Sequence, residues 1–295
     1  MLHKIKIITN LSEIEDIWKS LEPKDNPYMS YDIRKTISDI YDYPIYIIYN
    51  EQANTLLPLW YNTDSKTSEF LGGLAFENNE ILGNLYDFDI LESCPENTVL
   101  QDFSDKYQSN DVLLSGELKP NFFSIHKIKL DSEICSTRLK KNIRYYSKNV
   151  TCEPGDIDDL PKLINFLNNR LENSVYKDSR KVQALTELMG YFNSLGMLYP
   201  IRLVQGGKVF AYQFNIGYKN TMYPDLFGWD SSFAKLSPGI LCMWNSIQLA
   251  KLLGFELYSF GRGDADYKRK HWVIETSYTP FWVSDNETKE KFLNL

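Results

Sequence analysis

The order of hydrophobic patterns between residues 158 and 260 is the feature that most limits the folds open to this chain. Two amphipathic helices are predicted first, over 158–171 and 182–195, because their apolar residues recur every three or four positions. There follow the hairpin strands "IRLV" and "VFAYQFNIGY", the strand "TMYPDLFGW", a helix over 237–254 and the strand "FELYSF". This order predicts an α/β (α+β) fold in which helices flank a mixed, mostly antiparallel sheet.

The same order of helix, helix and hairpin is found near the start of the chain. Ser12 and Glu15 form a capping-box signal before an apolar helical face, and "IYIIY" and "LLPLWY" flank the polar segment "NEQANT". The series around 12–61 therefore matches the series around 159–218. We expect two domains, over 1–130 and 131–295; two unrelated helix-and-hairpin units are the alternative reading.

Composition limits the partners and the compartment. The chain has 295 residues, 43% of them hydrophobic, which is enough for one large core or two domains of ordinary size. A net charge of -7 argues against a DNA partner. Four scattered cysteines and three histidines predict no metal site. Without a signal peptide or an apolar run of about 18 residues, we expect a cytoplasmic protein with no membrane span.

A basic segment, "RLKKNIRYYSKN", stands out against the acidic whole. Its basic residues and a tyrosine recur at helical spacing and so share one face: Arg138, Lys141, Arg144, Tyr145 and Lys148. The face has two readings. It is either a solvated linking helix or a surface for a substrate phosphate or the acceptor end of a tRNA.

The segment "DLFGWDSSFAKLSPGILCMWNSIQLAKLLGFELYSFGRGDADYKRKHW" resembles GNAT-fold acyltransferases of the CelD/BcsL type, which are related to Fem-type aminoacyl transferases. The likeness rests on a loop with "SPG", a helix, a strand ending in "GRG", and "YK" followed by an aromatic residue. It extends more weakly over the first half, through "IWKSLE", "LLPLW" and "LGG". The resemblance implies two tandem GNAT-like domains, with an acyl-donor channel in the second.

The "SPG" segment is the predicted site for the donor. A helix that opens at Ser237 presents free amides and a partial positive charge, so the amides of Gly239, Ile240 and Leu241 could cradle a pyrophosphate. Arg262 could clamp a phosphate or carboxylate with its planar guanidinium. The Arg/Gln-x-x-Gly-x-Gly/Ala loop of classical acetyl-CoA users is absent. An ordinary helix start, capped by Ser237, is the alternative.

The charged segment "GRGDADYKRKHW" holds most of the predicted catalytic residues. The resemblance assigns Tyr267 to protonation of the leaving thiolate and Lys268 to charge stabilisation. Acyl transfer also needs a base for the amine, for which Asp230 and Asp264 are the candidates and Asp225 is a third. The alternative is structural, with the carboxylates in ion pairs and the lysine on a solvated helix face.

Together these features predict an enzyme, an N-acyltransferase of the GNAT superfamily. It would move an acyl group from acyl-CoA, acetyl-CoA before others, to an amine of a small molecule, sugar nucleotide or envelope precursor, with no tightly bound cofactor. The first alternative is an aminoacyl-tRNA-dependent transferase of the Fem type, with tRNA as partner. The second is a non-catalytic binding protein on the same fold.

Overall fold

The structure is a computed structural model that describes residues 5–73, 78–85, 87–107, 111–114, 118–119, 124–263 and 265–294. The chain divides into two compact units, Met1–Phe123 with Tyr278–Leu295 and Ser124–Ser277. This division differs from a boundary at 130/131 in two respects. The second unit begins earlier, because residues from Ser124 onward form a strand of its sheet, and the end of the chain returns to the first unit.

The first unit is built on an antiparallel sheet in the order β1-β2-β3-β4. Its strands are β1 (Ile5–Ile8), β2 (Ile45–Asn50), β3 (Thr55–Asn62) and β4 (Thr67–Phe70), and its first helices are α1 (Glu15–Leu21) and α2 (Tyr31–Tyr41). The predicted hairpin is confirmed as β2 and β3, which pair from Ile45 opposite Trp60 to Asn50 opposite Thr55. Strand β1 was not predicted.

The end of the chain completes the first unit. Strand β13 (Trp282–Val283) pairs with β5 (Val99–Leu100), and helix α9 (Asn286–Asn294) follows it. Phe281 is fully buried and exchanges two backbone hydrogen bonds with Leu114, of 2.8 and 3.2 Å. The last residues are therefore part of the core of the first unit.

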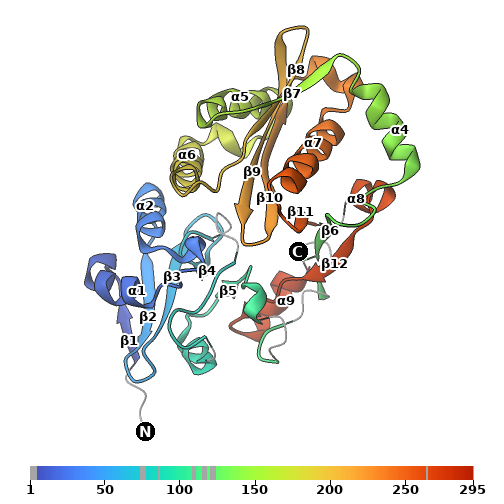
Figure 1. Cartoon of the computed structure of the whole chain (residues 1–295). Coiled ribbons are helices and arrows are strands. Elements are labelled where there is room, and N and C mark those ends of the chain that lie inside the picture. Colours follow the sequence, from blue (N-terminus) through green and yellow to red (C-terminus); the bar gives the residue numbers. More distant parts are fainter. Residues whose placement is uncertain are drawn as a thin grey trace. The chain divides into compact units, whose positions relative to one another are not determined.

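The second unit has a seven-stranded mixed sheet in the order β12-β6-β11-β10-β9-β8-β7 (Figure 1). Its strands are β6 (Ser124–Lys129), β7 (Val150–Pro154), β8 (Ile201–Gln205), β9 (Lys208–Tyr218), β10 (Thr221–Trp229), β11 (Leu257–Arg262) and β12 (Glu275–Tyr278). Strands β10 and β11 pair in parallel. Strand β6 pairs antiparallel with β11, and the neighbours in the series β7, β8, β9 and β10 also pair antiparallel. The predicted mixed, mostly antiparallel sheet is confirmed.

Helices cover both faces of this sheet (Figure 1). They are α4 (Thr137–Tyr146), α5 (Leu160–Arg170), α6 (Ser179–Ser194), α7 (Pro238–Leu252) and the short α8 (Asp266–His271). Figure 1 draws α5 and α6 on one side of β8 to β10 and α7 on the other. A Cβ atom on Gly228 would lie 2.8 Å from the Leu163 carbonyl oxygen, so glycine lets α5 approach β10.

The two units share an order of elements, as the sequence pattern predicted. In the first, β1, α1, α2, β2, β3 and β4 follow one another, and in the second β7, α5, α6, β8, β9 and β10 do the same. Each series forms four neighbouring antiparallel strands. The fold of the second unit, with a further helix and a parallel strand after this series, is GNAT-like.

Candidate active site

The parallel strands β10 and β11 separate along their length. Their pairing joins Thr221 to Leu257 and Met222 to Tyr258, and no later described residues of the two strands pair. The register of β10 against β9 then shifts between Pro224 and Leu226, and that of β11 against β6 shifts between Ser259 and Arg262. The central strands thus diverge toward the end of the sheet at which α7 begins.

Helix α7 begins beside this divergence. The Ser237 carbonyl accepts hydrogen bonds from the amides of Ile240 (3.0 Å) and Leu241 (3.2 Å), so two of the three predicted cradle amides are used inside the helix. No described residue accepts a hydrogen bond from the Gly239 amide. A Cβ atom on Gly239 would lie 3.5 Å from the Phe227 ring. The helix start offers a ligand one free amide, less than predicted.

Tyr267 lies on α8, directly after the end of β11. Its side chain is half-exposed, and partial burial raises the pKa of the phenol. The Tyr267 phenol also contributes to the raised pKa of the buried Tyr258, so the two side chains lie near each other. A phenol with a raised pKa stays protonated at neutral pH. Tyr267 therefore carries a proton at a position open to a ligand.

Lys268 differs from its prediction. The sequence predicted charge stabilisation for it, or a place on a solvated helix face, but only 3% of Lys268 is exposed. Its ammonium donates to the carbonyl oxygens of Gly261 (3.1 Å), Arg262 (2.7 Å) and Gly263 (2.8 Å). The physical reason is the turn after β11, whose carbonyls converge on one point. The structure gives Lys268 a structural contact where a catalytic one was predicted.

Asp230 is placed as a cap rather than as a base. Its carboxylate accepts hydrogen bonds from the Ser232 amide (2.9 Å) and hydroxyl (2.6 Å), and it pairs with Lys208 at 2.8 Å. The Lys208 ammonium and the Ser232 bonds hold the pKa of Asp230 at about 2. So low a pKa makes it a poor proton acceptor at neutral pH. Its contacts begin the short 3-10 helix Ser231–Leu236.

The other predicted charges differ in position. Asp225 is exposed and lies where the register of β10 against β9 shifts. Burial, and to a smaller extent the charge of Asp225, raise the pKa of the Tyr176 phenol. Arg262 is half-buried at the end of β11. Asp264 lies outside the described residues. Of the predicted carboxylates that the structure describes, Asp225 is the one that lies within β10 beyond its pairs with β11.

A buried polar chain under α7 was not predicted. The Gln213 amide donates to the Tyr258 hydroxyl (3.0 Å) and to the Asn215 side chain (2.8 Å), which in turn donates to the Tyr199 carbonyl (2.9 Å). The Ser246 hydroxyl lies close to Tyr258 without a hydrogen bond of good geometry. Tyr258 is the last β11 residue paired with β10. The apolar pattern of "FELYSF" did not indicate this buried chain of hydrogen bonds.

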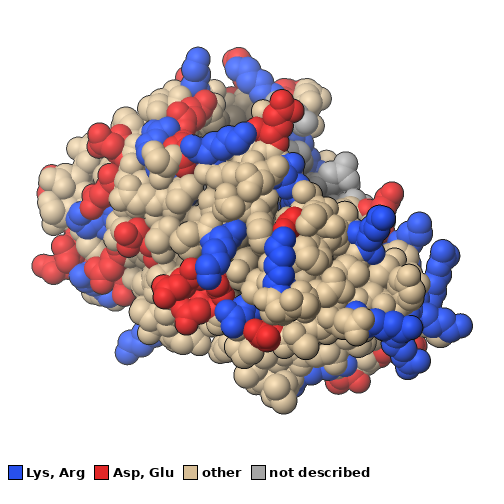
Figure 2. All heavy atoms as spheres, turned by 90° about the horizontal axis from the view of Figure 1, so that it is seen from above, with Lys and Arg blue, Asp and Glu red and all other residues tan. Residues whose placement is uncertain are grey.

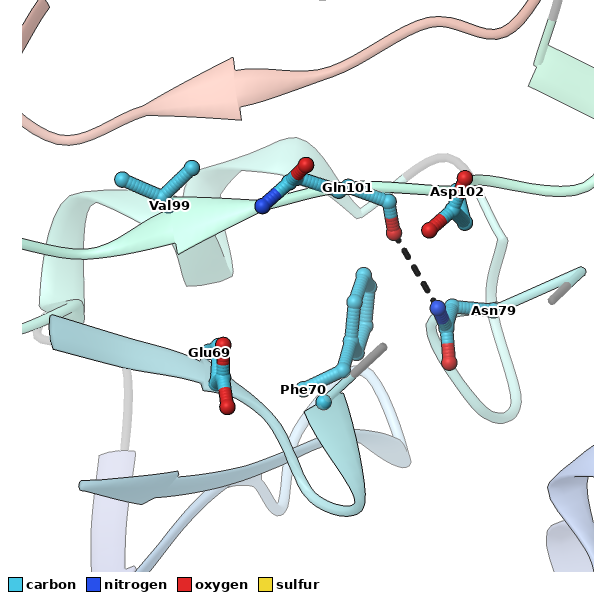
Figure 3. Close-up of a pocket in the computed structure, with 7 residues that line it drawn as sticks. Glu69, Phe70, Asn79, Val99, Gln101 and Asp102 are labelled. Carbon is cyan, nitrogen blue, oxygen red and sulfur yellow. Dashed lines mark hydrogen bonds between the residues drawn. The ribbon is translucent and has the colours of Figure 1, made fainter. Parts of the chain in front are cut away.

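The first unit holds a small cavity between β4 and β5. It is lined by Glu69, Phe70, Gly73, Asn79, Val99, Gln101 and Asp102 (Figure 3). Burial raises the pKa of Glu69, whose carboxylate accepts hydrogen bonds from Trp60 (3.0 Å) and Asn62 (2.9 Å). A volume of about 10 Å³ holds roughly one water molecule. The cavity is too small for a substrate.

Within the described ranges, His, Cys, Asp and Glu side chains form no group of three or more that could hold a metal ion. In the same part of the chain, no helix combines the length and apolar character needed to cross a bilayer. All four cysteines have free thiols.

Comparison with known families bears on the second unit. Residues 135–269, a little under half of the chain, match the family model described as an acetyltransferase (GNAT) domain. The matched range lies within the second unit. The matched range contains β10, α7, β11 and Tyr267. This match and the fold support acyltransferase activity. No match to a curated protein sequence was found.

Solved structures resemble the whole chain at low identity. A structure of FemX aligns with a TM-score of 0.61 at 8% identity, over 99% of this chain and 100% of that one. The C-terminal domain (DUF2156) of a putative lysylphosphatidylglycerol synthetase from Agrobacterium fabrum gives 0.57 at 11%, with 96% of each chain covered. L-PGS from Bacillus licheniformis gives 0.57 at 9%, over 93% and 97%. These likenesses show the fold alone.

Proposed function

We propose that the chain is an N-acyltransferase that uses acyl-CoA, acetyl-CoA before others, as its donor. The acceptor is an amine of a small molecule, sugar nucleotide or envelope precursor. In the reaction the amine attacks the thioester carbonyl, a C–N bond forms and the C–S bond breaks. The amine loses a proton to a base, and the thiolate gains one from an acid.

The divergence of β10 and β11 is the observation that carries this proposal. Two strands that pair only at Thr221–Leu257 and Met222–Tyr258 leave their later backbone groups for another partner. An extended thioester arm could lie between them, with its phosphates toward the free amide of Gly239. The matched GNAT domain covers both features.

Two side chains are proposed for the proton transfers. Tyr267 is half-exposed and protonated, which suits the acid that gives its proton to the leaving thiolate. Asp225 is exposed at the shifted register of β10, which suits the base that takes the proton of the amine. Asp230 and Lys268 are not proposed for chemistry, because their charged groups are held by the fold.

A binding screen tests the donor. The purified full chain is titrated in a calorimeter with acetyl-CoA, longer acyl-CoAs and free CoA, and separately with aminoacyl-tRNA. The proposal expects saturable binding of an acyl-CoA, together with a higher melting temperature in its presence. If the chain binds aminoacyl-tRNA and binds no CoA species, the donor is aminoacyl-tRNA and the second candidate below replaces this proposal.

The second candidate is an aminoacyl-tRNA-dependent transferase of the Fem type. It is favoured by the exposed side chains of Arg138, Lys141 and Arg144 on α4 and of Lys148 in the turn after it, which form no ion pair with the described residues. The sequence predicted Lys148 on the helix itself, but α4 ends at Tyr146. The exposed Tyr145 lies among them, at 70% exposure, and offers a ring for a base to stack on. Figure 2 shows Lys and Arg side chains crowded at the right-hand edge, the side on which Figure 1 draws both α4 and α8.

Charge reversal at the end of α4 and in the turn after it separates the two candidates. Arg144→Glu with Lys148→Glu should leave acetyl-CoA affinity unchanged if the donor is a coenzyme between β10 and β11. A tRNA donor would instead lose at least about tenfold in affinity, since each phosphate contact adds to a salt-dependent attraction. Lys181→Glu with Lys219→Glu, away from this face, is the matched control.

The likeness to the CelD/BcsL type and a non-catalytic binding function are two further proposals. The first rests on "SPG", "GRG" and "YK", of which "YK" contains a buried lysine. A binding protein on this fold would hold an acyl-CoA without consuming it. Release of free thiol from acetyl-CoA, measured with a mixture of amines, distinguishes a transferase from such a protein.

A further inference from the structure

The turn after β11 has an unusual arrangement of carbonyl groups. Three successive carbonyl oxygens, those of Gly261, Arg262 and Gly263, all lie within 3.1 Å of the Lys268 ammonium nitrogen. In an extended strand, successive carbonyls point in alternating directions. Gly261 (φ 67°) and Gly263 (φ 86°) adopt the left-handed region, which turns the carbonyls toward one side.

Converging carbonyl oxygens form a cation site. Each carries partial negative charge, and rings of backbone carbonyls bind monovalent cations by replacing their hydration shell. An ammonium group has N–H donors for each of these three carbonyl acceptors. Lys268 is 3% exposed, so its ammonium is shielded from bulk solvent. The free energy cost of burying the charge is offset by the three charge-assisted bonds.

We propose that the carbonyls of residues 261–263 are a monovalent-cation site and that the Lys268 ammonium is its built-in cation. In this arrangement Lys268 is a positioning residue. It fastens the end of β11 to α8 and so fixes the place of Tyr267, the neighbouring residue on that helix. The cation site itself stands on the contacts of the turn; the role of Tyr267 in proton transfer rests on the proposed function.

Removal of the lysine side chain should leave a vacant site that a small ammonium ion can refill. The Lys268→Ala variant is unfolded thermally in equal concentrations of sodium, ammonium, propylammonium and tetramethylammonium chloride. We expect its melting temperature in sodium chloride to lie about 5–10 °C below that of the wild type, because buried carbonyls lose their donors. Ammonium and propylammonium should restore at least half of this loss, and tetramethylammonium, which has no N–H, none.

Two matched variants control for packing and for general salt effects. Lys268→Met keeps the volume of the side chain but carries no charge, so it should be destabilised and should not respond to ammonium ions. Lys270→Ala removes an exposed cation from the same helix and should melt with the wild type in every salt. If Lys268→Ala accumulates only as unfolded protein, it is refolded from urea in each salt. Recovery of folded protein with propylammonium or ammonium, and none with sodium or tetramethylammonium, supports the site.

The contrary results are equally definite. A Lys268→Met variant as stable as the wild type overturns the cation site. So does equal rescue or recovery of Lys268→Ala in tetramethylammonium or sodium chloride, or the absence of rescue in every salt. Hydrogen exchange of the amides of 261–268 should rise in Lys268→Ala and fall again with propylammonium. Unchanged exchange contradicts the positioning of α8. Failure of acetyl-CoA to bind the wild type would remove the proposed function and leave these stability results as they are.

Discussion

Adjacent residues in the charged segment have different surroundings. Tyr267 is 44% exposed, whereas Lys268 is 3% exposed and bonded to three carbonyls. Neighbours on a helix point about 100° apart, so one can face a ligand while the other faces the core. Chemistry at this position therefore belongs to the tyrosine, and the lysine serves the turn.

Replacement of Tyr267 by phenylalanine tests the proposed acid. The change removes the hydroxyl and keeps the ring, so we expect kcat to fall roughly 10²-fold while the melting temperature stays unchanged. Steady-state rates of thiol release, with the acceptor found in the amine screen, measure the effect. Tyr145→Phe, at an exposed tyrosine of α4, is the matched control and should keep the wild-type rate. An unchanged kcat in Tyr267→Phe would remove this residue from the mechanism.

Asp225 as base gives a separate kinetic result. Asp225→Asn keeps the size of the side chain but removes the proton acceptor, so we expect kcat to fall roughly 10²-fold with donor affinity unchanged. Rates at rising pH should recover part of the loss, because more of the amine is then already deprotonated. Asp230→Asn should retain most of the activity. Equal losses in the two variants would contradict the assignment.

Asp230 should affect stability in a defined pH range. Its pKa falls from 3.8 to about 2 on folding, so its stabilising effect is complete above about pH 4 and disappears as the pH falls to about 2. Asn keeps the cap but not the ion pair with Lys208, and we expect Asp230→Asn to melt up to about 4 °C below the wild type at pH 7. Melting curves from pH 7 to 2 should converge. A constant difference would contradict the lowered pKa.

Elements with strong periodic patterns were predictable, and those defined by pairing alone were not. Helices α5, α6 and α7 and strands β8 to β11 lie where the apolar spacing placed them. Strand β7 was missed because it is a short edge strand with exposed residues, and β1 because four residues carry little pattern. The burial of Lys268 and the Gln213–Tyr258 bond depend on contacts between distant residues, which spacing does not encode.

The start of α7 can be tested without damage to the fold. A Cβ on Gly239 would lie 3.5 Å from the Phe227 ring, an ordinary van der Waals contact, so Gly239→Ala should keep the wild-type melting temperature. The methyl group would obstruct a phosphate at the free amide, and we expect acetyl-CoA to bind about tenfold more weakly. Gly190→Ala in α6, where the added atom meets nothing within 4 Å, is the control. Undiminished binding in Gly239→Ala would move the phosphate site elsewhere.

At the scale of the whole molecule, the end of the chain determines where the first unit can be cut. A fragment of residues 1–130 lacks β13 and the buried Phe281, whose loss costs about 3–5 kcal/mol of a total near 5–15 kcal/mol. We expect this fragment to show no cooperative thermal transition by circular dichroism. Residues 1–123 joined by a flexible linker to 278–295 should regain one. Cooperative melting of the shorter fragment would restore the division at 130/131.

Both units repeat one series of elements, but the acyltransferase proposal concerns the second. There the parallel strands part beside the start of α7, within the matched range 135–269. Calorimetric titration of the full chain with acetyl-CoA tests this claim most directly. The account predicts saturable binding at a single site, about tenfold weaker in Gly239→Ala and unchanged in Gly190→Ala. Absence of binding by acetyl-CoA, longer acyl-CoAs and free CoA alike would contradict it.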